Sequence, residues 1–310
     1  MKVAILDDYQ RVALQSADWS PVAERAEIDV FSDHISDADE LVRRLEPYDV
    51  VMVMRERTPL PADVLQRLPR LKMIASTGPV NASIDTEAAQ RLGIHIGTTG
   101  GSVSSTVELT WALILAAARN LVRESMSVRD GGWQTSVGQE LEGKVLAVLG
   151  VGRIGSRVAR IGAAFGMRVI AWSPNLTRAT AEAVGVDAVD RDTLFRTADV
   201  LTIHLRLSER SRGLVGAAEL AAMKPTALLV NTSRGPIVDE DALVSALRDG
   251  GIAGAGLDVF DVEPLPPQHP LRTLPGVVAT PHIGYVADRP YGIFFRDAVA
   301  AITEWLRSVQ

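Results

Sequence analysis

The stretch Lys144–Gly166, KVLAVLGVGRIGSRVARIGAAFG, decides the fold of this chain. It begins with a continuous apolar run at Val145–Leu149, passes through closely spaced glycines, and takes up a helical pattern from about Arg153. A second apolar run follows at Val169–Trp172. Strand, tight turn, helix and strand in this order predict a βαβ unit, because parallel strands can be joined only by a crossover connection.

The glycines of this unit have the spacing G-x-G-x-x-G. Gly150 permits the tight turn, Gly152 lets the backbone approach a pyrophosphate, and Gly155 lets the helix pack close to the strand. The helix N-terminus then offers free N–H groups and the positive end of its dipole to the phosphates. Glycines also punctuate ordinary turns, but the complete strand–turn–helix–strand context indicates dinucleotide binding.

The position that usually selects the coenzyme carries no charge. In the dinucleotide fingerprint, an acidic residue about 20 residues after the first glycine holds the ribose 2′-OH of NAD. Here Ser173 follows the second strand, and the next acidic residue is Glu182. We therefore expect either NAD or NADP as the cofactor, and Arg178 could help to bind the 2′-phosphate of NADP.

Outward from this unit, apolar runs alternate with amphipathic segments along the whole chain, which favours an α/β architecture. Before it, we predict strands at Lys2–Leu6, Ile28–Phe31, Val50–Met54, Met73–Ser76 and Ile94–Ile96. Helices are predicted at Ala38–Leu45, Ala62–Leu68 and Ile84–Arg91, followed by one long helix from about Ser105 to Arg129. After the unit, we predict strands at Val200–His204, Leu228–Thr232, Gly256–Val259 and Val277–Thr280, and a last helix at Ala287–Leu306.

Two series of strands joined by a long helix predict two domains, in keeping with the length of 310 residues. The dinucleotide-binding domain should span residues 101–284, and its continuous apolar strands are typical of a parallel sheet covered on both faces. The last helix should pack back on the first domain, which would then combine residues 1–100 with residues 285–310.

Composition excludes several classes of function. The net charge is −6 and the charges are dispersed, so nothing favours a nucleic-acid partner. The absence of cysteine excludes disulfides, thiolate catalysis and cysteine-ligated metal sites. No apolar run is long enough to span a membrane, and the N-terminal run is too short for a signal peptide. From these missing signals we expect a cytoplasmic protein without a membrane partner.

Three motifs follow predicted strands and carry polar residues at the strand ends. They are NTSRG at Asn231–Gly235, DVFDVEP at Asp258–Pro264 and TPHIG at Thr280–Gly284. Ligands of open α/β sheets bind at the carboxyl ends of the strands, so these motifs should share one rim with the glycine turn.

Arg234, Glu263 and His282 fit the requirements of hydride transfer to a ketone. Such a reaction needs a proton donor for the carbonyl oxygen, which a histidine can provide. It needs a cation with two-pronged geometry for the substrate carboxylate, and a carboxylate that orients the histidine. Singly, each residue could be an ion-pair partner, a loop carboxylate or a core histidine, but together behind a nucleotide fold they predict catalysis.

The other histidines are His34, His95, His204 and His269. None has a histidine partner four residues away, so we expect no metal site. His204 closes a predicted strand and could line the cofactor cleft, and a structural role is equally open.

In this order, the motifs GVGRIG, NTSRGPIVDE, DVFDVEPLP and TPHIG resemble those of the D-isomer-specific 2-hydroxyacid dehydrogenases, which include phosphoglycerate dehydrogenase and glyoxylate/hydroxypyruvate reductase. The resemblance covers nearly the whole chain. It implies a flavodoxin-like substrate domain built from both chain ends, a central Rossmann domain, and a homodimer. The implied activity is hydride transfer between NAD or NADP and a small D-2-hydroxy acid or 2-oxo acid.

By position, the resemblance implies that Arg234 binds the substrate, Glu263 pairs with the histidine and His282 is the acid/base. Its cofactor-binding residues would be the three glycines with Arg153 and Ile154 at the pyrophosphate, Ser173 at the adenosine ribose and Asp258 at the nicotinamide amide. We also expect His204 and Thr232, at the ends of their strands, among the cofactor-binding residues.

In the substrate domain, the resemblance implies substrate contacts from Arg55, Gly78 and Val80, although Arg55 could equally be a solvated loop arginine. The loop TGPVNASID departs from the family pattern, because Pro79 has no N–H to offer to a carboxylate. Arg206 stands where the family often has proline, and Ser173 replaces the usual acidic residue.

A second function remains open at this point. The chain could be a non-catalytic NAD(H)-sensing protein on the same fold, as a resemblance to C-terminal-binding corepressors allows. Those proteins can keep the catalytic residues, but this chain lacks long disordered tails for recruiting partners, which favours the enzyme. A fold-mate acting on formate or phosphonate would differ only in its pocket residues.

Overall fold

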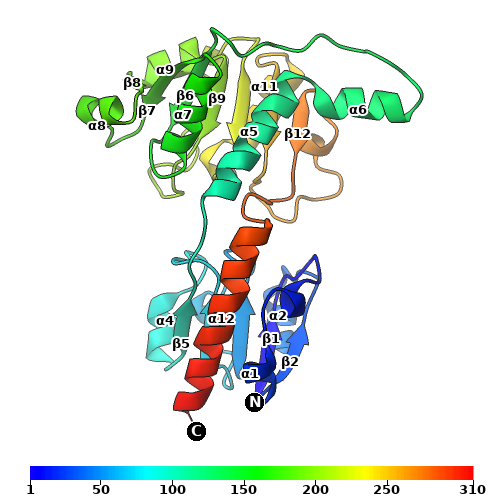
Figure 1. The fold of residues 1–310 in the computed structure, drawn as a ribbon, viewed down its shortest axis with the longest axis vertical. Coiled ribbons are helices and arrows are strands. Elements are labelled where there is room, and N and C mark those ends of the chain that lie inside the picture. Colours follow the sequence, from blue (N-terminus) through cyan, green and yellow to red (C-terminus); the bar gives the residue numbers. More distant parts are fainter. Residues whose placement is uncertain (310) are drawn as a thin grey trace. The chain divides into compact units, whose positions relative to one another are not determined.

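The computed structural model describes residues 1–309 as two compact units. Unit 1 combines Met1–Ser102 with the C-terminal segment from Val286, and unit 2 is Val103–Tyr285. Each unit is an open parallel sheet with helices on its faces (Figure 1). Among residues 1–309, no helix is long and apolar enough to cross a membrane.

Unit 1 contains a five-stranded parallel sheet in the order β2-β1-β3-β4-β5. Its strands are β1 (Lys2–Ile5), β2 (Glu27–Val30), β3 (Val50–Val53), β4 (Met73–Ser76) and β5 (His95–Thr98). Its helices are α1 (Ser20–Ala23), α2 (Ala38–Leu45), α3 (Ala62–Leu65), α4 (Thr86–Arg91) and α12 (Asp288–Ser308), with a 3₁₀ turn η1 (Ala13–Gln15). The C-terminal helix α12 packs on β4 and β5 through buried side chains such as Phe295 and Ile302 (Figure 1).

Unit 2 contains a seven-stranded parallel sheet in the order β12-β11-β10-β9-β6-β7-β8. Its strands are β6 (Val145–Leu149), β7 (Arg168–Trp172), β8 (Asp187–Ala188), β9 (Val200–Ile203), β10 (Leu228–Asn231), β11 (Gly254–Leu257) and β12 (Val277–Ala279). Its helices are α5 (Ser104–Ala118), α6 (Leu121–Arg129), α7 (Gly155–Ala164), α8 (Arg178–Ala183), α9 (Arg191–Thr197), α10 (Ala217–Ala222) and α11 (Glu240–Arg248), with 3₁₀ turns η2 (Gly235–Ile237) and η3 (Pro270–Arg272).

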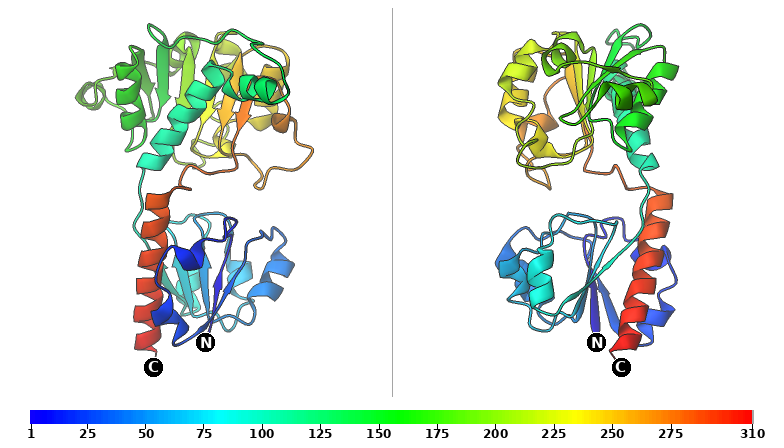
Figure 2. Two further views of the ribbon diagram at one scale, coloured as in Figure 1. Left: turned by 45° about the vertical axis from the view of Figure 1, so that its right-hand side comes forward. Right: turned by 90° about the vertical axis from the view of Figure 1, so that its left-hand side faces the viewer.

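Apolar cores lie on both faces of the unit 2 sheet. One core includes α5 and α7, which cover β10–β12 and β6–β7 respectively, and the other includes α9, α10 and α11 (Figure 2). The predicted α/β class with doubly wound parallel sheets is confirmed. The strand order reverses at β6, which lies between β7 and β9, and this reversal is where such sheets bind ligands.

The single long helix predicted over Ser105–Arg129 is wrong. Helix α5 ends at Ala118, and Asn120 has a left-handed φ of +52°, after which α6 begins at Leu121. Asparagine adopts this conformation more readily than most residues, and the apolar periodicity around it does not report the break. The helix after the glycine turn also begins at Gly155 rather than near Arg153.

Candidate active site

The three glycines of the predicted dinucleotide turn each have a distinct environment in unit 2. Gly150 has a φ of +100°, and a Cβ there would lie 2.8 Å from the carbonyl oxygen of His204. A Cβ on Gly155 would overlap the carbonyl oxygen of Gly150, so this position must be glycine for the helix to lie against the strand. Gly152 has open space around it, which fits the approach of a pyrophosphate.

Helix α7 starts directly behind this turn. No side chain caps its N-terminus at Ile154, and Gly152 and Arg153 are exposed. The first backbone N–H groups of a helix are unsatisfied within the helix and attract anions. The turn therefore fits the diphosphate of a dinucleotide.

Ser173 and His204 follow strands β7 and β9 on either side of the glycine turn. His204 Nε2 lies 2.9 Å from the Thr202 hydroxyl, and burial lowers the pKa of His204 to about 3. His204 is therefore neutral, and its backbone N–H donates to the carbonyl of Leu149, next to Gly150, at 2.8 Å. Arg178 pairs with Glu182 along α8 at 3.1 Å, so its guanidinium is engaged with its own helix rather than with Ser173.

The most direct sign of chemistry is a histidine–carboxylate pair. His282 Nδ1 lies 2.6 Å from Glu263 Oε2, and Glu263 Oε1 accepts a hydrogen bond of 3.0 Å from the backbone N–H of Phe260. Burial raises the pKa of Glu263, but the hydrogen bond and charge of His282 outweigh it and leave the pKa lowered. Glu263 is therefore ionised, and Nε2 is the imidazole nitrogen left for a substrate.

His282 is held in an unusual backbone conformation, with a φ of +53°. A non-glycine residue in this region costs on the order of 1–3 kcal/mol and persists only where its surroundings impose it. Buried Asp258 imposes it here by accepting bonds from the Thr280 hydroxyl (2.6 Å) and from the N–H groups of Ile283 and Gly284 (2.8 Å each). Burial raises the pKa of Asp258. Its proposed contact with the nicotinamide amide stays a prediction.

Arg234 reaches the same region from the end of β10. The side chain of Asn231 shapes the turn by accepting from Ser233 N at 3.0 Å and donating to Arg234 O at 2.9 Å. Gly235 then packs on the backbone of Phe260, where any Cβ would overlap it. The charge of Arg234 also contributes to lowering the pKa of Glu263. The structure thus gathers the three predicted catalytic residues within unit 2.

Some supporting residues were not predicted from the sequence. The Thr232 hydroxyl lies 2.8 Å from that of Thr110 on α5, so it faces this helix, and its cofactor contact stays a prediction. Thr106 Oγ1 donates to the carbonyl of Gly284 at 3.0 Å. Thr106 and Thr110 lie within the mainly apolar run of α5, and no local sequence pattern indicates their partners Gly284 and Thr232.

Unit 1 brings together two of its three predicted substrate residues. Arg55 follows β3 with a φ of +55°, and its Nη1 donates to the carbonyl of Thr77 at 3.2 Å. The guanidinium lies directly over Gly78, where a Cβ would overlap it. Asn81 donates to the carbonyl of Arg55 at 2.5 Å, and Val80 is 66% exposed. Arg55, just after β3, is therefore half-buried and hydrogen-bonded to the loop after β4, and its substrate contact stays a prediction.

The sequence also matches a known family model. The model described as "D-isomer specific 2-hydroxyacid dehydrogenase, NAD binding domain" matches residues 111–284, more than half of the chain. The chain belongs to the D-isomer-specific 2-hydroxyacid dehydrogenase family.

Several named relatives agree with this assignment. A glyoxylate reductase of Aeropyrum pernix is 48% identical over 71% of this chain and 69% of its own length. A hydroxypyruvate reductase of Thermotoga maritima is 38% identical over 84% of this chain and 85% of its own length. The crystal structure of a phosphoglycerate oxidoreductase from Vibrio cholerae O395 has a TM-score of 0.94 and 38% identity, covering 99% of both chains.

The chain spans only 47% of the D-3-phosphoglycerate dehydrogenase of Archaeoglobus fulgidus, to which it is 40% identical.

As a 2-hydroxyacid dehydrogenase, the chain is an oxidoreductase that transfers a hydride between NAD(P)(H) and a small D-2-hydroxy acid or 2-oxo acid. The predicted activity and cofactor class are confirmed. The alternative, a non-catalytic NAD(H)-sensing protein, is not supported.

Proposed function

We propose that this dehydrogenase reduces a small 2-oxo acid such as glyoxylate or hydroxypyruvate, with His282 as the proton donor and Arg234 as the carboxylate-binding residue. The observation that carries the proposal is the 2.6 Å pair between His282 Nδ1 and ionised Glu263. The substrate class is supported by the relatives named glyoxylate reductase and hydroxypyruvate reductase.

The bound nicotinamide supplies the hydride in this reaction. The Glu263 carboxylate holds His282 through Nδ1, which leaves the Nε2–H to be given to the carbonyl oxygen as negative charge develops there. Arg234 binds the substrate carboxylate with two parallel N–H bonds and so fixes the carbonyl carbon for attack. In the oxidation direction the same imidazole accepts the hydroxyl proton.

In unit 1, we propose that Arg55 and the loop Gly78–Val80 contact the substrate. The guanidinium of Arg55 is braced against Gly78, which presents a fixed cation at the carboxyl edge of the sheet. Pro79 has no N–H, and the Gly78 N–H donates to the Thr99 hydroxyl at 2.7 Å, so Val80 is the backbone donor left among these three residues.

We also propose that both coenzymes are used. Ser173 stands at the end of β7, where an acidic residue would bind the 2′-OH of NAD and repel the 2′-phosphate of NADP. A serine hydroxyl can hydrogen-bond either group. Arg178 is paired with Glu182, so a role at the 2′-phosphate would require it to leave that partner.

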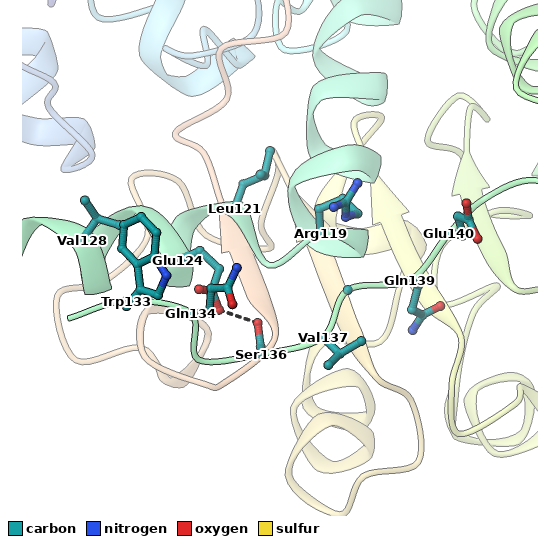
Figure 3. A pocket seen from close by; sticks show the side chains of 11 residues that line it. Arg119, Leu121, Glu124, Val128, Trp133, Gln134, Ser136, Val137, Gln139 and Glu140 are labelled. Atoms are coloured by element: carbon teal, nitrogen blue, oxygen red, sulfur yellow. Dashed lines mark hydrogen bonds between the residues drawn. The ribbon is translucent and has the colours of Figure 1, made fainter.

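A homodimer is supported by the surface of α6 and the segment after it (Figure 3). Helix α6 has no buried residue, and its apolar side chains are half exposed, including Leu121 at 52% and Met126 at 57%. Trp133 and Val137 line a groove together with Leu121, and they are 73% and 96% exposed. Large apolar side chains gathered in this way typically mark a protein interface, and we propose a second copy of this chain as the partner.

The segment that carries these side chains is held in place from α6. Glu124 accepts hydrogen bonds from the hydroxyls of Ser136 and Thr135, which lower its pKa to about 2.

Sedimentation of the wild type and of Met126→Asp tests the dimer. We expect a dimer and a monomer respectively, and a monomeric wild type would refute the proposal. The cytoplasmic location stays a prediction, tested by fractionation of the native host.

The activity is tested by following NADH and NADPH oxidation with a panel of 2-oxo acids. We expect turnover of glyoxylate or hydroxypyruvate with either coenzyme. Pyruvate, which has a methyl group where glyoxylate has the aldehyde hydrogen, serves as a comparison. An enzyme that turns over none of these acids would refute the proposed substrate class.

A further inference from the structure

The loop that carries Glu263 is anchored in the apolar core of unit 2 by Phe260 and Leu265, which are 5% and 9% exposed. It leaves β11 after Leu257 and contains Pro264, Pro266 and Pro267 without regular structure until η3. Val262 is 61% exposed. Between the two apolar anchors, polar contacts with the rest of unit 2 also bear on the position of the Glu263 carboxylate.

One side chain, Glu240 at the start of α11, holds the loop at two points. Its Oε2 accepts a hydrogen bond of 3.2 Å from the backbone N–H of Asp261, and its Oε1 lies 3.1 Å from His269 Nε2. The segment between these two points, residues 261–269, contains Glu263. Glu240 thus ties both ends of the arc that carries Glu263.

The partner of Glu240 is also fixed. His269 Nδ1 accepts a hydrogen bond of 3.3 Å from the N–H of Leu271. A nitrogen that accepts carries no hydrogen, so the tautomer that satisfies both contacts has its hydrogen on Nε2, directed at Glu240. The side chains of His269 and Glu240 are only 20% and 18% exposed, which shields the pair from competing water.

The same glutamate lies beneath the NTSRG turn. Glu240 lines a small cavity of about 10 Å³ together with Asn231 and Gly235. Asn231 holds the carbonyl of Arg234, and Gly235 packs on the backbone of Phe260. Glu240 therefore lies at the junction of the two loops that carry Arg234 and Glu263.

We propose that Glu240 and His269 form a second carboxylate–histidine pair, which positions the loop of Glu263 for the reaction. Neither residue is catalytic, because each acts through the Asp261–Glu263 backbone. The inference rests on the proposed function, in which Glu263 orients His282. A displacement of about 1 Å in a catalytic group can cost about 10²-fold in rate, so loosening this arc should lower kcat.

The test compares Glu240→Ala and His269→Ala with Glu219→Ala as the control. Glu219 on α10 is 21% exposed, pairs with Arg191 at 2.8 Å and accepts from Gly216 N at 2.9 Å. It thus makes the same kinds of contact as Glu240 without touching the Glu263 loop. We expect kcat to fall about tenfold or more in the first two variants, with little change in KM, while the control keeps the wild-type kcat.

A conservative variant separates positioning from general structural damage. In His269→Gln, the side-chain amide can place an N–H near the original Nε2 and donate to Glu240. We expect it to recover most of the kcat lost in His269→Ala. Wild-type kcat in folded Glu240→Ala, or an equal loss in Glu219→Ala, would overturn the proposal, as would an effect on KM alone.

Hydrogen exchange gives a readout that does not need turnover. The Asp261 amide should exchange faster in Glu240→Ala than in the wild type and in Glu219→Ala, because its acceptor is gone. If the wild type reduces none of the 2-oxo acids, the proposed function fails while the exchange result still decides whether the pair holds the loop. Equal exchange in all three proteins would overturn the inference.

Discussion

Replacing Glu263 by glutamine removes one charge and one acceptor from the His282 pair at almost constant volume. Glu263 uses both oxygens, Oε1 for the Phe260 N–H and Oε2 for His282 Nδ1. Glutamine has only one oxygen, so it cannot accept both bonds. If the oxygen stays with Phe260, the amide N–H faces Nδ1, which forces the imidazole into the neutral tautomer with its hydrogen on Nε2.

The size of the effect follows from the lost charge. At an effective dielectric constant of about 20, opposite charges about 4 Å apart attract by about 4 kcal/mol. That energy corresponds to about 10³-fold in rate, since about 1.36 kcal/mol gives tenfold. The side chains of His282 and Glu263 are 20% and 31% exposed, so water weakens the attraction. We therefore expect kcat to fall by about 10²–10³-fold in Glu263→Gln.

The assay is steady-state oxidation of NADH with a saturating 2-oxo acid, together with a binding titration of NADH. Coenzyme affinity should be unchanged, because Glu263 does not belong to the glycine turn. A matched control is Glu182→Gln, which removes one partner of the ion pair with Arg178 on α8 and should keep the wild-type kcat. A kcat for Glu263→Gln within about threefold of the wild type would refute the assigned role of the carboxylate.

His282→Ala should lose about 10²–10⁴-fold in kcat with coenzyme affinity retained, and near-normal turnover would remove it as proton donor. Arg234→Lys keeps the charge but not the two-pronged geometry, so kcat/KM should fall by about tenfold or more, whereas an unchanged value would place the residue outside the site. Ser173→Asp should shift the kcat/KM ratio toward NADH, and an unchanged ratio would show that this position does not contact the ribose. The pKa of Glu263 is lowered from 4.5, so its stabilisation is present above pH 4.5 and is lost as pH falls below it. Urea unfolding should therefore show Glu263→Gln less stable than the wild type at pH 6, with the gap closing at lower pH; a gap independent of pH would contradict the sign.

The glycine turn could be predicted because each glycine answers a local requirement. The contact between Gly155 and the carbonyl of Gly150 arises within six residues, so the spacing alone carries it. The same holds for the inner strands β6, β9 and β10 of unit 2, whose mainly apolar runs are buried on both faces.

What the sequence could not show depends on distant partners. The left-handed backbone of His282 needs Asp258, and the partner of Glu240 is His269, 29 positions along the chain. Of the four histidines outside the catalytic motif, sequence reasoning gave a role only to His204. Side-chain contacts across loops leave no periodic trace, so such pairs become visible only in three dimensions.

The acid–base pair and the Arg55–Gly78 brace lie in different units, which bears on how the substrate specificity of this enzyme can change. The acid–base pair and the groups that orient it, Asp258, Phe260 and Asn231, all lie within Val103–Tyr285. The brace between Arg55 and Gly78 lies wholly in the other unit. Under the proposed function, in which the brace contacts the substrate, substitutions around it change which acid is recognised while the residues proposed for proton transfer stay as they are in the other unit.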